Sequence, residues 1–391
     1  MKLACVIHRY GVDIAGGSEA HCRQLSERLS HRHHVTVLTS CARDYVTWAN
    51  AYPEGPSRIG DVDVIRFPVR RPRRLKSFAD VSDEVFDGRS TPERQECWFR
   101  ENGPDVPGLL DHLRKHGREY ELVLFWSYRY FPAYFGLPLV ADRAVLVPTA
   151  EEDPAIELDV LTDYFAQPAG FIFLTPEEEQ LVTRRAGRRL EPAAIVGSGL
   201  DPAPPRPARS ILSALGIPER YVLYLGRIDR NKGCQTLFEY FVEHTARDGG
   251  DVPLVLAGPA TIPVPSHPRI RALGFVADDV REALLAHARA LVVPSPFESL
   301  SIALLEGWNH GVPVLVNAEC RVLDGQVRRG NGGLPYRSPM EFSEALTWLC
   351  TRPEAATLGA QGLAYVEREY RWPTVLARTE RLLAEVRARR A

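Results

Sequence analysis

The sequence predicts an α/β protein made of two doubly wound, Rossmann-like domains in tandem, facing an interdomain cleft. Three observations predict this fold. The chain has 391 residues, more than one ordinary core holds. Short apolar runs alternate with segments of helical periodicity, which is typical of parallel sheets covered by helices. A proline-rich stretch, GLDPAPPRPARS at 199–210, interrupts that alternation in mid-chain.

The first half supplies the elements of one such domain. Strands are predicted where apolar residues run together or alternate, and a helix where they recur at helical spacing. The predicted strands are 3–8, 34–40, 61–69, 121–126, 144–149, 170–175 and 193–197, and the helix is 18–30. In such sheets ligands bind beyond the carboxyl ends of the strands.

After the proline-rich stretch the alternation restarts. The predicted strands are 221–226, 252–258, 270–276, 290–295 and 312–317. Helices are predicted at 233–246, at 278–289, from 299 onward, and at 339–351, 353–369 and 372–390. We therefore expect an N-terminal domain at 1–198, a linker at 199–212, a C-terminal domain at 213–371, and a final helix at 372–391 that packs back on the N-terminal domain.

Composition excludes several classes of protein. The net charge of −2 argues against a general nucleic-acid binder, which is normally strongly basic. No apolar run approaches the length of a membrane-spanning helix. The apolar run before His8 is too short for a signal peptide, so we expect a cytoplasmic protein. Seven scattered cysteines without a CxxC pair indicate reduced thiols instead of a disulfide frame or a zinc site.

The loop GRIDRNKG at 226–233 is a candidate anion site. Gly226 ends a predicted strand, and Arg227 and Lys232 precede a predicted helix. Two cations beside the free N–H groups of a helix N-terminus favour a bound phosphate. The alternative is a solvated turn. The loop lacks the GxxxxGK[ST] pattern, so it is not a P-loop.

A second motif, PSPFESLSIALLEGW at 294–308, carries two acids. Glu298 follows a predicted strand, and Glu306 lies eight residues further on in an apolar stretch. If both lie on one helix, the rise per residue places them about 12 Å apart. That is about the span from a sugar hydroxyl, across a diphosphate, to a ribose. The alternative makes Glu298 a first-turn acid and Glu306 a solvated one, but an idle acid in an apolar helix is costly.

Together these motifs resemble glycosyltransferase family 4, the retaining nucleotide-sugar transferases of GT-B fold. The resemblance also rests on AGGSEAHCRQLSERLS, on SGLD at 198–201 and on LGFV at 273–276, and it covers essentially the whole chain. It implies a metal-independent transfer without a cofactor, in which the donor binds the C-terminal domain and the acceptor the N-terminal one. The implied donor contacts are Gly16, Gly17, Gly226, Arg227, Lys232, Val276, Glu298, Ser299, Leu300, Ser301 and Glu306.

The resemblance also assigns roles. Arg227 and Lys232 would bind the donor diphosphate, Glu298 the sugar, and Glu306 the ribose. The backbone near Leu300 and Ser301 would meet the distal phosphate, Val276 the base, and Gly16–Gly17 the donor, although an ordinary tight turn is the alternative for the two glycines. Arg227, Lys232 and Glu298 are the predicted catalytic residues.

One departure from the family concerns the segment after the strand at 144–149. Many members have a histidine there, whereas this chain reads TAEEDP. Glu151, Glu152 and Asp153 are therefore candidate acceptor contacts, with Tyr128 from the aromatic segment 125–135. A solvated loop and core packing are the respective alternatives. The sequence assigns no nucleophile, no general base and no metal ligand, and we interpret the DxD at 61–63 as part of a strand.

The segment RFPVRRPRRLK at 66–76 concentrates six cations. It is predicted either to contact an anionic membrane or lipid-diphosphate acceptor at the inner membrane face, or to be a solvated loop. The predicted function is transfer of a sugar to a glycan, lipid-linked or small-molecule acceptor in polysaccharide or glycoconjugate biosynthesis. The alternatives are a nucleotide-sugar 2-epimerase of the same fold and a non-catalytic nucleotide-sugar-binding partner.

Overall fold

The computed structural model describes residues 1–14, 16–248 and 252–390. This part of the chain divides into two compact units. The first is Met1–Gly199 together with Val375–Ala391, and the second is Leu200–Thr374. Each unit contains a mostly or wholly parallel sheet covered by helices, which confirms the predicted fold class.

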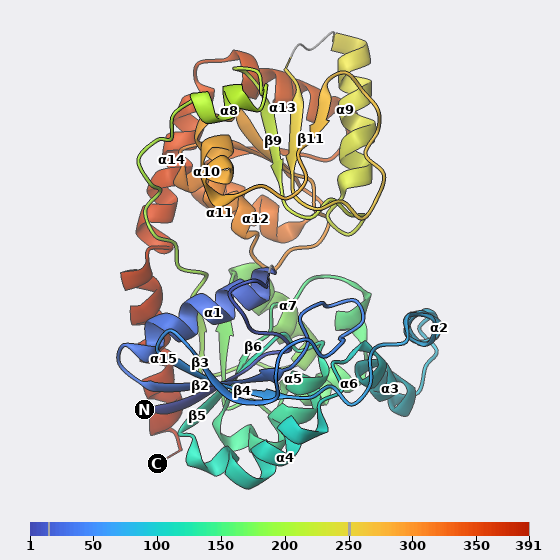
Figure 1. The fold of residues 1–391 in the computed structure, drawn as a ribbon, viewed down its shortest axis with the longest axis vertical. Helices are drawn as coiled ribbons and strands as arrows, with labels where there is room; N and C mark the ends of the chain where they lie inside the picture. Colours follow the sequence, from blue (N-terminus) through green and yellow to red (C-terminus); the bar gives the residue numbers. More distant parts are fainter. Residues whose placement is uncertain (15, 249–251, 391) are drawn as a thin grey trace. The chain divides into compact units, whose positions relative to one another are not determined.

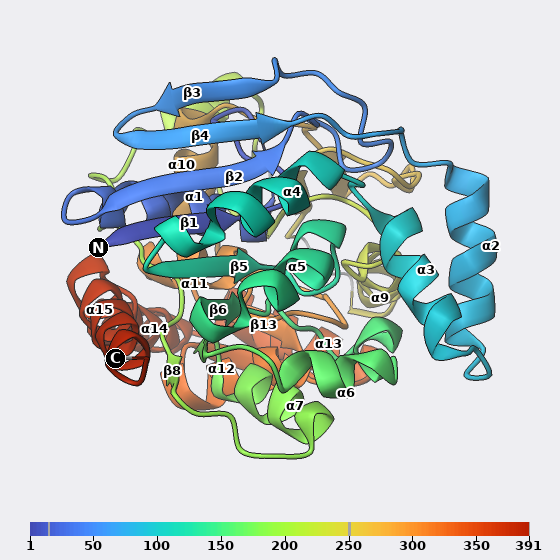
Figure 2. The same ribbon diagram turned by 90° about the horizontal axis from the view of Figure 1, so that it is seen from below.

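The sheet of the first unit has the strand order β3-β4-β2-β1-β5-β6-β7-β8. All neighbours are parallel except the hairpin of β3 and β4 at one edge, and Figure 2 shows β3, β4, β2 and β1 in that order. The strands are β1 (Lys2–Val6), β2 (His34–Ser40), β3 (Gly55–Ile59), β4 (Val62–Phe67), β5 (Leu122–Trp126), β6 (Ala144–Val147), β7 (Gly170–Phe173) and β8 (Ala193–Ile195). The order reverses between β1 and β5, which marks the position where such sheets bind ligands.

Helices cover both faces of this sheet, and in Figure 1 α1 lies on one face and α4 on the other. They are α1 (Gly17–Ser30), α2 (Leu75–Phe86), α3 (Pro92–Asn102), α4 (Pro107–His116), α5 (Phe131–Gly136), α6 (Val160–Phe165) and α7 (Pro176–Ala186). Short 3-10 helices cover Gly117–Glu119, Leu137–Arg143 and Pro154–Glu157. Because both faces are covered, the central strands are apolar without alternation, as in β5, all of whose residues are buried.

The C-terminal helix α15 (Trp372–Ala388) belongs mainly to the first unit. It begins at Trp372-Pro373 as predicted, since proline is tolerated in a first turn. Glu380 binds the His33 imidazole at 2.8 Å, and Arg387 binds Glu121 at 2.8 Å. These contacts join the last helix to the strands and loops of residues 1–199.

The second unit has a parallel sheet of order β11-β10-β9-β12-β13-β14. Its strands are β9 (Val222–Leu225), β10 (Leu254–Ala257), β11 (Ile270–Ala272), β12 (Ala290–Val293), β13 (Val314–Asn317) and β14 (Gly333–Tyr336). Its helices are α8 (Ser210–Ala214), α9 (Cys234–Asp248), α10 (Asp278–His287), α11 (Ile302–Asn309), α12 (Arg321–Gly330), α13 (Pro339–Thr351) and α14 (Ala355–Glu369). Among the described residues, no helix is long and apolar enough to span a bilayer.

Candidate functional site

In the second unit, the loop after β9 carries the predicted phosphate-binding cations. Asp229 organises this loop, because its carboxylate contacts the Arg227 guanidinium and accepts the backbone N–H of Lys232 at 2.8 Å. The Lys232 ammonium donates to the Glu298 carboxylate at 2.7 Å, and both side chains are mostly buried. Because β9 and β12 are neighbours in the sheet, the two motifs meet at the carboxyl ends of their strands.

Two glycines allow this close approach. At Gly233, φ is +70°, and a Cβ there would lie 2.2 Å from the Pro294 carbonyl oxygen. At Gly258, φ is +145°, and a Cβ would lie 1.9 Å from the Gly226 carbonyl oxygen. Any side chain at either position would therefore push the loop after β9 away from its neighbours.

The predicted helix start at 299 is wrong. Helix α11 begins at Ile302, and Ser301 before it has a left-handed conformation with φ of 67°. The side-chain amide of Gln326 donates to the Leu300 carbonyl, which fixes the loop. Glu298 and Ser299 therefore lie in a loop ahead of the helix, so the helical rise does not give the distance from Glu298 to Glu306.

Glu306 has a protein partner that the sequence did not reveal. The Arg281 guanidinium, from α10, contacts its carboxylate. Arg281 also binds Glu282 at 2.7 Å, and Glu282 binds the His310 imidazole at 2.8 Å. Burial raises the pKa of Glu306, while the charge of Arg281 opposes this. Val276, the predicted base contact, is half-buried in the loop before α10, beside the exposed Phe275.

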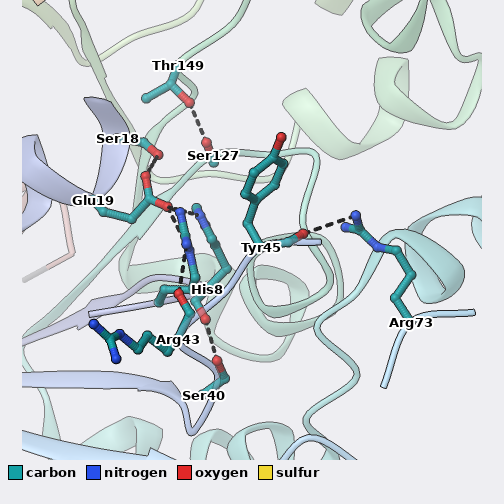
Figure 3. Close-up of polar contacts among 10 residues, drawn as sticks. His8, Ser18, Glu19, Ser40, Arg43, Tyr45, Arg73, Ser127 and Thr149 are labelled. Carbon is teal, nitrogen blue, oxygen red and sulfur yellow. Dashed lines mark hydrogen bonds and ion pairs between the residues drawn. The ribbon is translucent and has the colours of Figure 1, made fainter. Parts of the chain in front are cut away.

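In the first unit, a buried polar cluster follows β1. Glu19, in the first turn of α1, accepts hydrogen bonds from His8 at 3.0 Å and from Arg9 Nε at 2.9 Å. Ser18 donates to its other carboxylate oxygen at 2.8 Å (Figure 3). Burial alone would raise the pKa of Glu19, but His8 and Arg9 outweigh it and hold that pKa far below its usual range. This cluster was not predicted, although His8 and Arg9 lie just beyond the end of β1 at Val6.

Gly16 and Gly17 lie at the start of α1, beside this cluster. Gly17 is the first helical residue, and Gly16 is extended with φ of 169°. A Cβ at Gly16 would lie 2.3 Å from a Glu19 carboxylate oxygen. Packing of the Glu19 side chain thus gives one physical reason for glycine here, and the donor contact stays a prediction.

Aromatic and basic side chains surround the cluster. The Tyr130 ring packs at a tilt against His8 with centroids 3.9 Å apart, and Trp48 meets His8 edge-on at 5.8 Å. The Arg73 guanidinium lies 4.9 Å from the Trp48 ring centre and donates to the Tyr45 carbonyl at 3.1 Å. Arg73 therefore belongs to this buried neighbourhood and not to an exposed basic face.

The other arginines of the basic segment are also engaged. Arg70 contacts Asp105, and Arg71 contacts Glu101. Arg66 is buried and donates to the Tyr10 carbonyl at 2.9 Å. Arg70 and Arg71 thus have acidic partners although both are exposed, and membrane contact by this segment stays a prediction.

The predicted acceptor acids are ion-paired. Arg129 binds Asp153 at 2.6 Å and approaches Glu151 at 4.0 Å. Arg184 binds Glu152 at 3.2 Å. Tyr128 is fully buried and packs edge-on against Phe165 at 5.4 Å, so in this structure its ring is part of the core.

Two hydroxyl residues lie at the carboxyl ends of β5 and β6. Ser127 Oγ and Thr149 Oγ1 are 2.5 Å apart (Figure 3). Both have positive φ, 60° at Ser127 and 48° at Thr149. This conformation is rare for residues other than glycine, particularly β-branched ones, and costs on the order of 1–3 kcal/mol per residue.

A buried carboxyl group holds this strained segment. Glu178 is fully buried in the first turn of α7, which Thr175 caps and Pro176 begins. Its two oxygens accept the backbone N–H of Ala150 at 2.7 Å and of Leu174 at 2.6 Å. Burial raises the pKa of Glu178 to about 8, although these hydrogen bonds act to lower it.

This raised pKa predicts that stability falls as pH rises. Between the ordinary value of 4.5 and the folded value of about 8, the folded state binds more protons at Glu178 than the unfolded state. Its contribution is complete below pH 4.5 and is lost as pH rises through 8, at roughly 1 kcal/mol per pH unit. Urea unfolding from pH 5 to 9 should show this slope, and Glu178→Gln should remove it. An equal slope in the variant would contradict the assignment.

Among the described residues, no group of three or more His, Cys, Asp or Glu side chains is placed to hold a metal ion. In the DxD segment, Asp61 lies 3.4 Å from Arg58, and Asp63 lies on β4, 3.5 Å from His34. Both carboxylates thus have cationic or imidazole neighbours.

Part of the second unit is similar in sequence to known glycosyltransferases. Residues 219–352 match the family model described as glycosyl transferases group 1. Alpha-D-kanosaminyltransferase from Streptomyces kanamyceticus is 28% identical over 166 residues, which cover 38% of this chain and 41% of that protein. The chain therefore matches only about two fifths of this relative's length.

Solved structures share the architecture over the whole chain. Sucrose-phosphate synthase from Thermosynechococcus elongatus has a TM-score of 0.72 at 20% identity, with 100% of both chains covered. Trehalose 6-phosphate synthase from Burkholderia multivorans has a TM-score of 0.73 at 15% identity, again with 100% of both chains covered. Anabaena HepE in complex with UDP-glucose has a TM-score of 0.69 at 16% identity, with 100% of both chains covered. The chain therefore has the GT-B fold of these proteins, and its residues 219–352 are similar to the glycosyl transferases group 1.

Proposed function

We propose that the protein is a retaining glycosyltransferase that moves a sugar from a nucleotide-diphosphate sugar to an acceptor hydroxyl. The observation that carries the proposal is the contact of Lys232 with Glu298, 2.7 Å apart, inside the segment that matches the transferase model. Lys232 would bind phosphate and Glu298 would bind sugar hydroxyls. The two lie at the same end of the sheet, so one ligand in which a sugar is joined to a diphosphate could contact both.

The mechanism follows from charge. When the bond from the sugar to the diphosphate breaks, negative charge develops on the leaving phosphate. Lys232 and Arg227 would stabilise that charge without a metal ion, and such stabilisation is usually the largest catalytic contribution. When the donor binds, Lys232 would leave Glu298 and contact the phosphate. The Glu298 carboxylate could then accept hydrogen bonds from hydroxyl groups of the sugar.

Glu306 and Arg281 would act on the nucleoside. A carboxylate can accept hydrogen bonds from the two hydroxyls of a ribose, and the charge of Arg281 opposes the rise in the pKa of Glu306 that burial causes. Retention, independence of metal and the acceptor in polysaccharide or glycoconjugate synthesis are parts of the proposal that the family resemblance supplies.

Turnover without acceptor tests the proposal. The protein is incubated with a panel of nucleotide sugars that begins with UDP-glucose, and products are separated by chromatography. Slow release of nucleoside diphosphate and free sugar is the expected result. An isomerised donor would identify an epimerase instead, and saturable binding without any turnover would identify a non-catalytic partner protein.

We also propose that the start of α2 contacts an anionic membrane. Arg74 and Lys76 are exposed there beside Leu75, whose side chain is 52% exposed. We expect binding to anionic liposomes that weakens with salt, since such charges are screened over about 10 Å at 0.1 M. Glu substitutions at Arg74 and Lys76 should abolish sedimentation with the liposomes, whereas Arg70→Gln should not. Failure of the wild type to sediment would disprove the contact.

A further inference from the structure

A groove in the second unit is lined by residues that have no part in the proposed donor site. Its two walls are helix α9, drawn in yellow in Figure 1, and the extended segment at 262–265. Its volume is about 560 Å³, which is within the range of small-molecule sites. The apolar part of its lining consists of Phe238, Val242, Ile262, Pro263 and Pro265. Because Val242 is 36% exposed, an apolar ligand in the groove would remove apolar surface from water.

Acidic side chains line the same groove. Glu239 and Glu243 lie in the second and third turns of α9, where like charges four residues apart slightly destabilise a helix. Glu239 accepts the Gln235 side-chain amide at 3.2 Å, and among the described residues neither carboxylate has a cationic partner. Arg230, which precedes α9, is the one cation in this lining, and one cation against two acids leaves a net charge of −1. The groove therefore favours a cationic ligand over an anionic one.

Hydrogen bonds connect one wall of the groove to the loop of phosphate-binding cations. The Ile228 N–H donates to the Pro259 carbonyl at 2.8 Å, and the Thr261 N–H donates to the Ile228 carbonyl at 2.9 Å. Ile228 is fully buried and directly follows Arg227. A ligand that contacts both walls would hold the segment at 259–265 in place and, through these two bonds, the backbone beside Arg227.

From these observations we propose that the groove is a regulatory site, which binds an apolar molecule carrying a positively charged amine and thereby increases the affinity for the donor. The apolar body would cover Phe238 and Val242. The amine would lie between Glu239 and Glu243, whose carboxylates would accept its hydrogen bonds. The effect on the donor rests on the proposed function. Because coupling between two sites is reciprocal, ligand and donor should each bind more tightly when the other is present.

Ligand-observed NMR on the full chain tests the site, with phenylbutylamine as the probe and phenylbutyrate as its anionic counterpart. The amine should bind, and the carboxylate should bind much more weakly. Replacing both Glu239 and Glu243 with glutamine should weaken amine binding about fivefold. Val242→Trp fills the groove and should abolish it. Glu219→Gln removes an exposed acid that does not line the groove, and should bind the amine like the wild type. Melting temperatures report whether each variant is folded.

Donor kinetics test the coupling. Saturating amine should lower the KM for UDP-glucose hydrolysis about fivefold in the wild type and leave it unchanged in Val242→Trp. Absence of amine binding to the wild type, or equal amine affinity in the wild type and the double glutamine variant, would overturn the site. Amine binding with an unchanged or raised KM would overturn the regulatory role. A wild type that binds the amine but turns over no donor would refute the proposed transferase and leave the amine site standing.

Discussion

Replacing Lys232 with alanine should lower kcat for donor turnover by about a hundredfold, equivalent to about 3 kcal/mol of transition-state stabilisation. The ammonium would face the departing diphosphate, where charge grows as the glycosidic bond breaks. Arg227→Ala should have a similar effect, because its guanidinium shares the loop and Asp229 orients both residues. Steady-state kinetics at saturating donor measure the change.

This experiment needs two controls, melting temperatures and a variant of a neighbouring arginine. Lys232→Ala also leaves Glu298 without its ion-pair partner, so melting temperatures must accompany the kinetics. Arg230 lies in the same loop but is exposed, and Arg230→Ala should retain wild-type turnover. Near-normal kcat in both the Lys232 and the Arg227 variants would show that the diphosphate binds elsewhere.

Much of the fold was predictable because buried parallel strands are apolar without interruption. Short, wholly apolar runs such as LVLFW of β5 and ALVV of β12 are typical of buried strands. Between β4 and β5 no helix was predicted, yet α2, α3 and α4 lie there. In α3, PERQECWFREN, the apolar side chains are few and charged residues dominate, so its helical periodicity is weak.

The candidate site was predictable where one short motif holds the residues. Lys232 and Glu298 belong to two such motifs, and their contact follows from the pairing of β9 with β12. Arg281 was not predictable, because its contact with Glu306 depends on how α10 packs beside α11. The start of α11 was misplaced because Gln326, far along the chain, fixes the Leu300 carbonyl.

The buried cluster of His8, Arg9 and Glu19 in the first unit was also not predictable from local sequence. His8 and Glu19 are separated by a turn, and nothing local to either residue reveals their contact. Thr149 likewise gives no sign of its positive φ, since a β-branched residue is normally read as extended. Glu178, in another helix, fixes the neighbouring backbone. Such positions depend on tertiary contacts and not on local preference.

The two acids should differ in which kinetic constant they control. Glu306 would hold the ribose equally in the ground state and the transition state, so Glu306→Gln should mainly raise the donor KM, by about tenfold. Glu298 would hold the sugar whose ring shape and charge change during reaction. Glu298→Gln should therefore lower kcat more than it raises KM, by about tenfold or more.

The ion pair of Glu306 provides the control that separates binding from folding. Glu282 contacts the same Arg281 and also His310, but it has no proposed contact with the donor. Glu282→Gln thus perturbs the same charge network and should leave the donor KM unchanged. Thermal melts of all three variants report any loss of stability from unpaired buried groups. If Glu306→Gln loses turnover at unchanged KM and unchanged melting temperature, the roles of the two acids are reversed, because only a contact formed in the transition state has that signature.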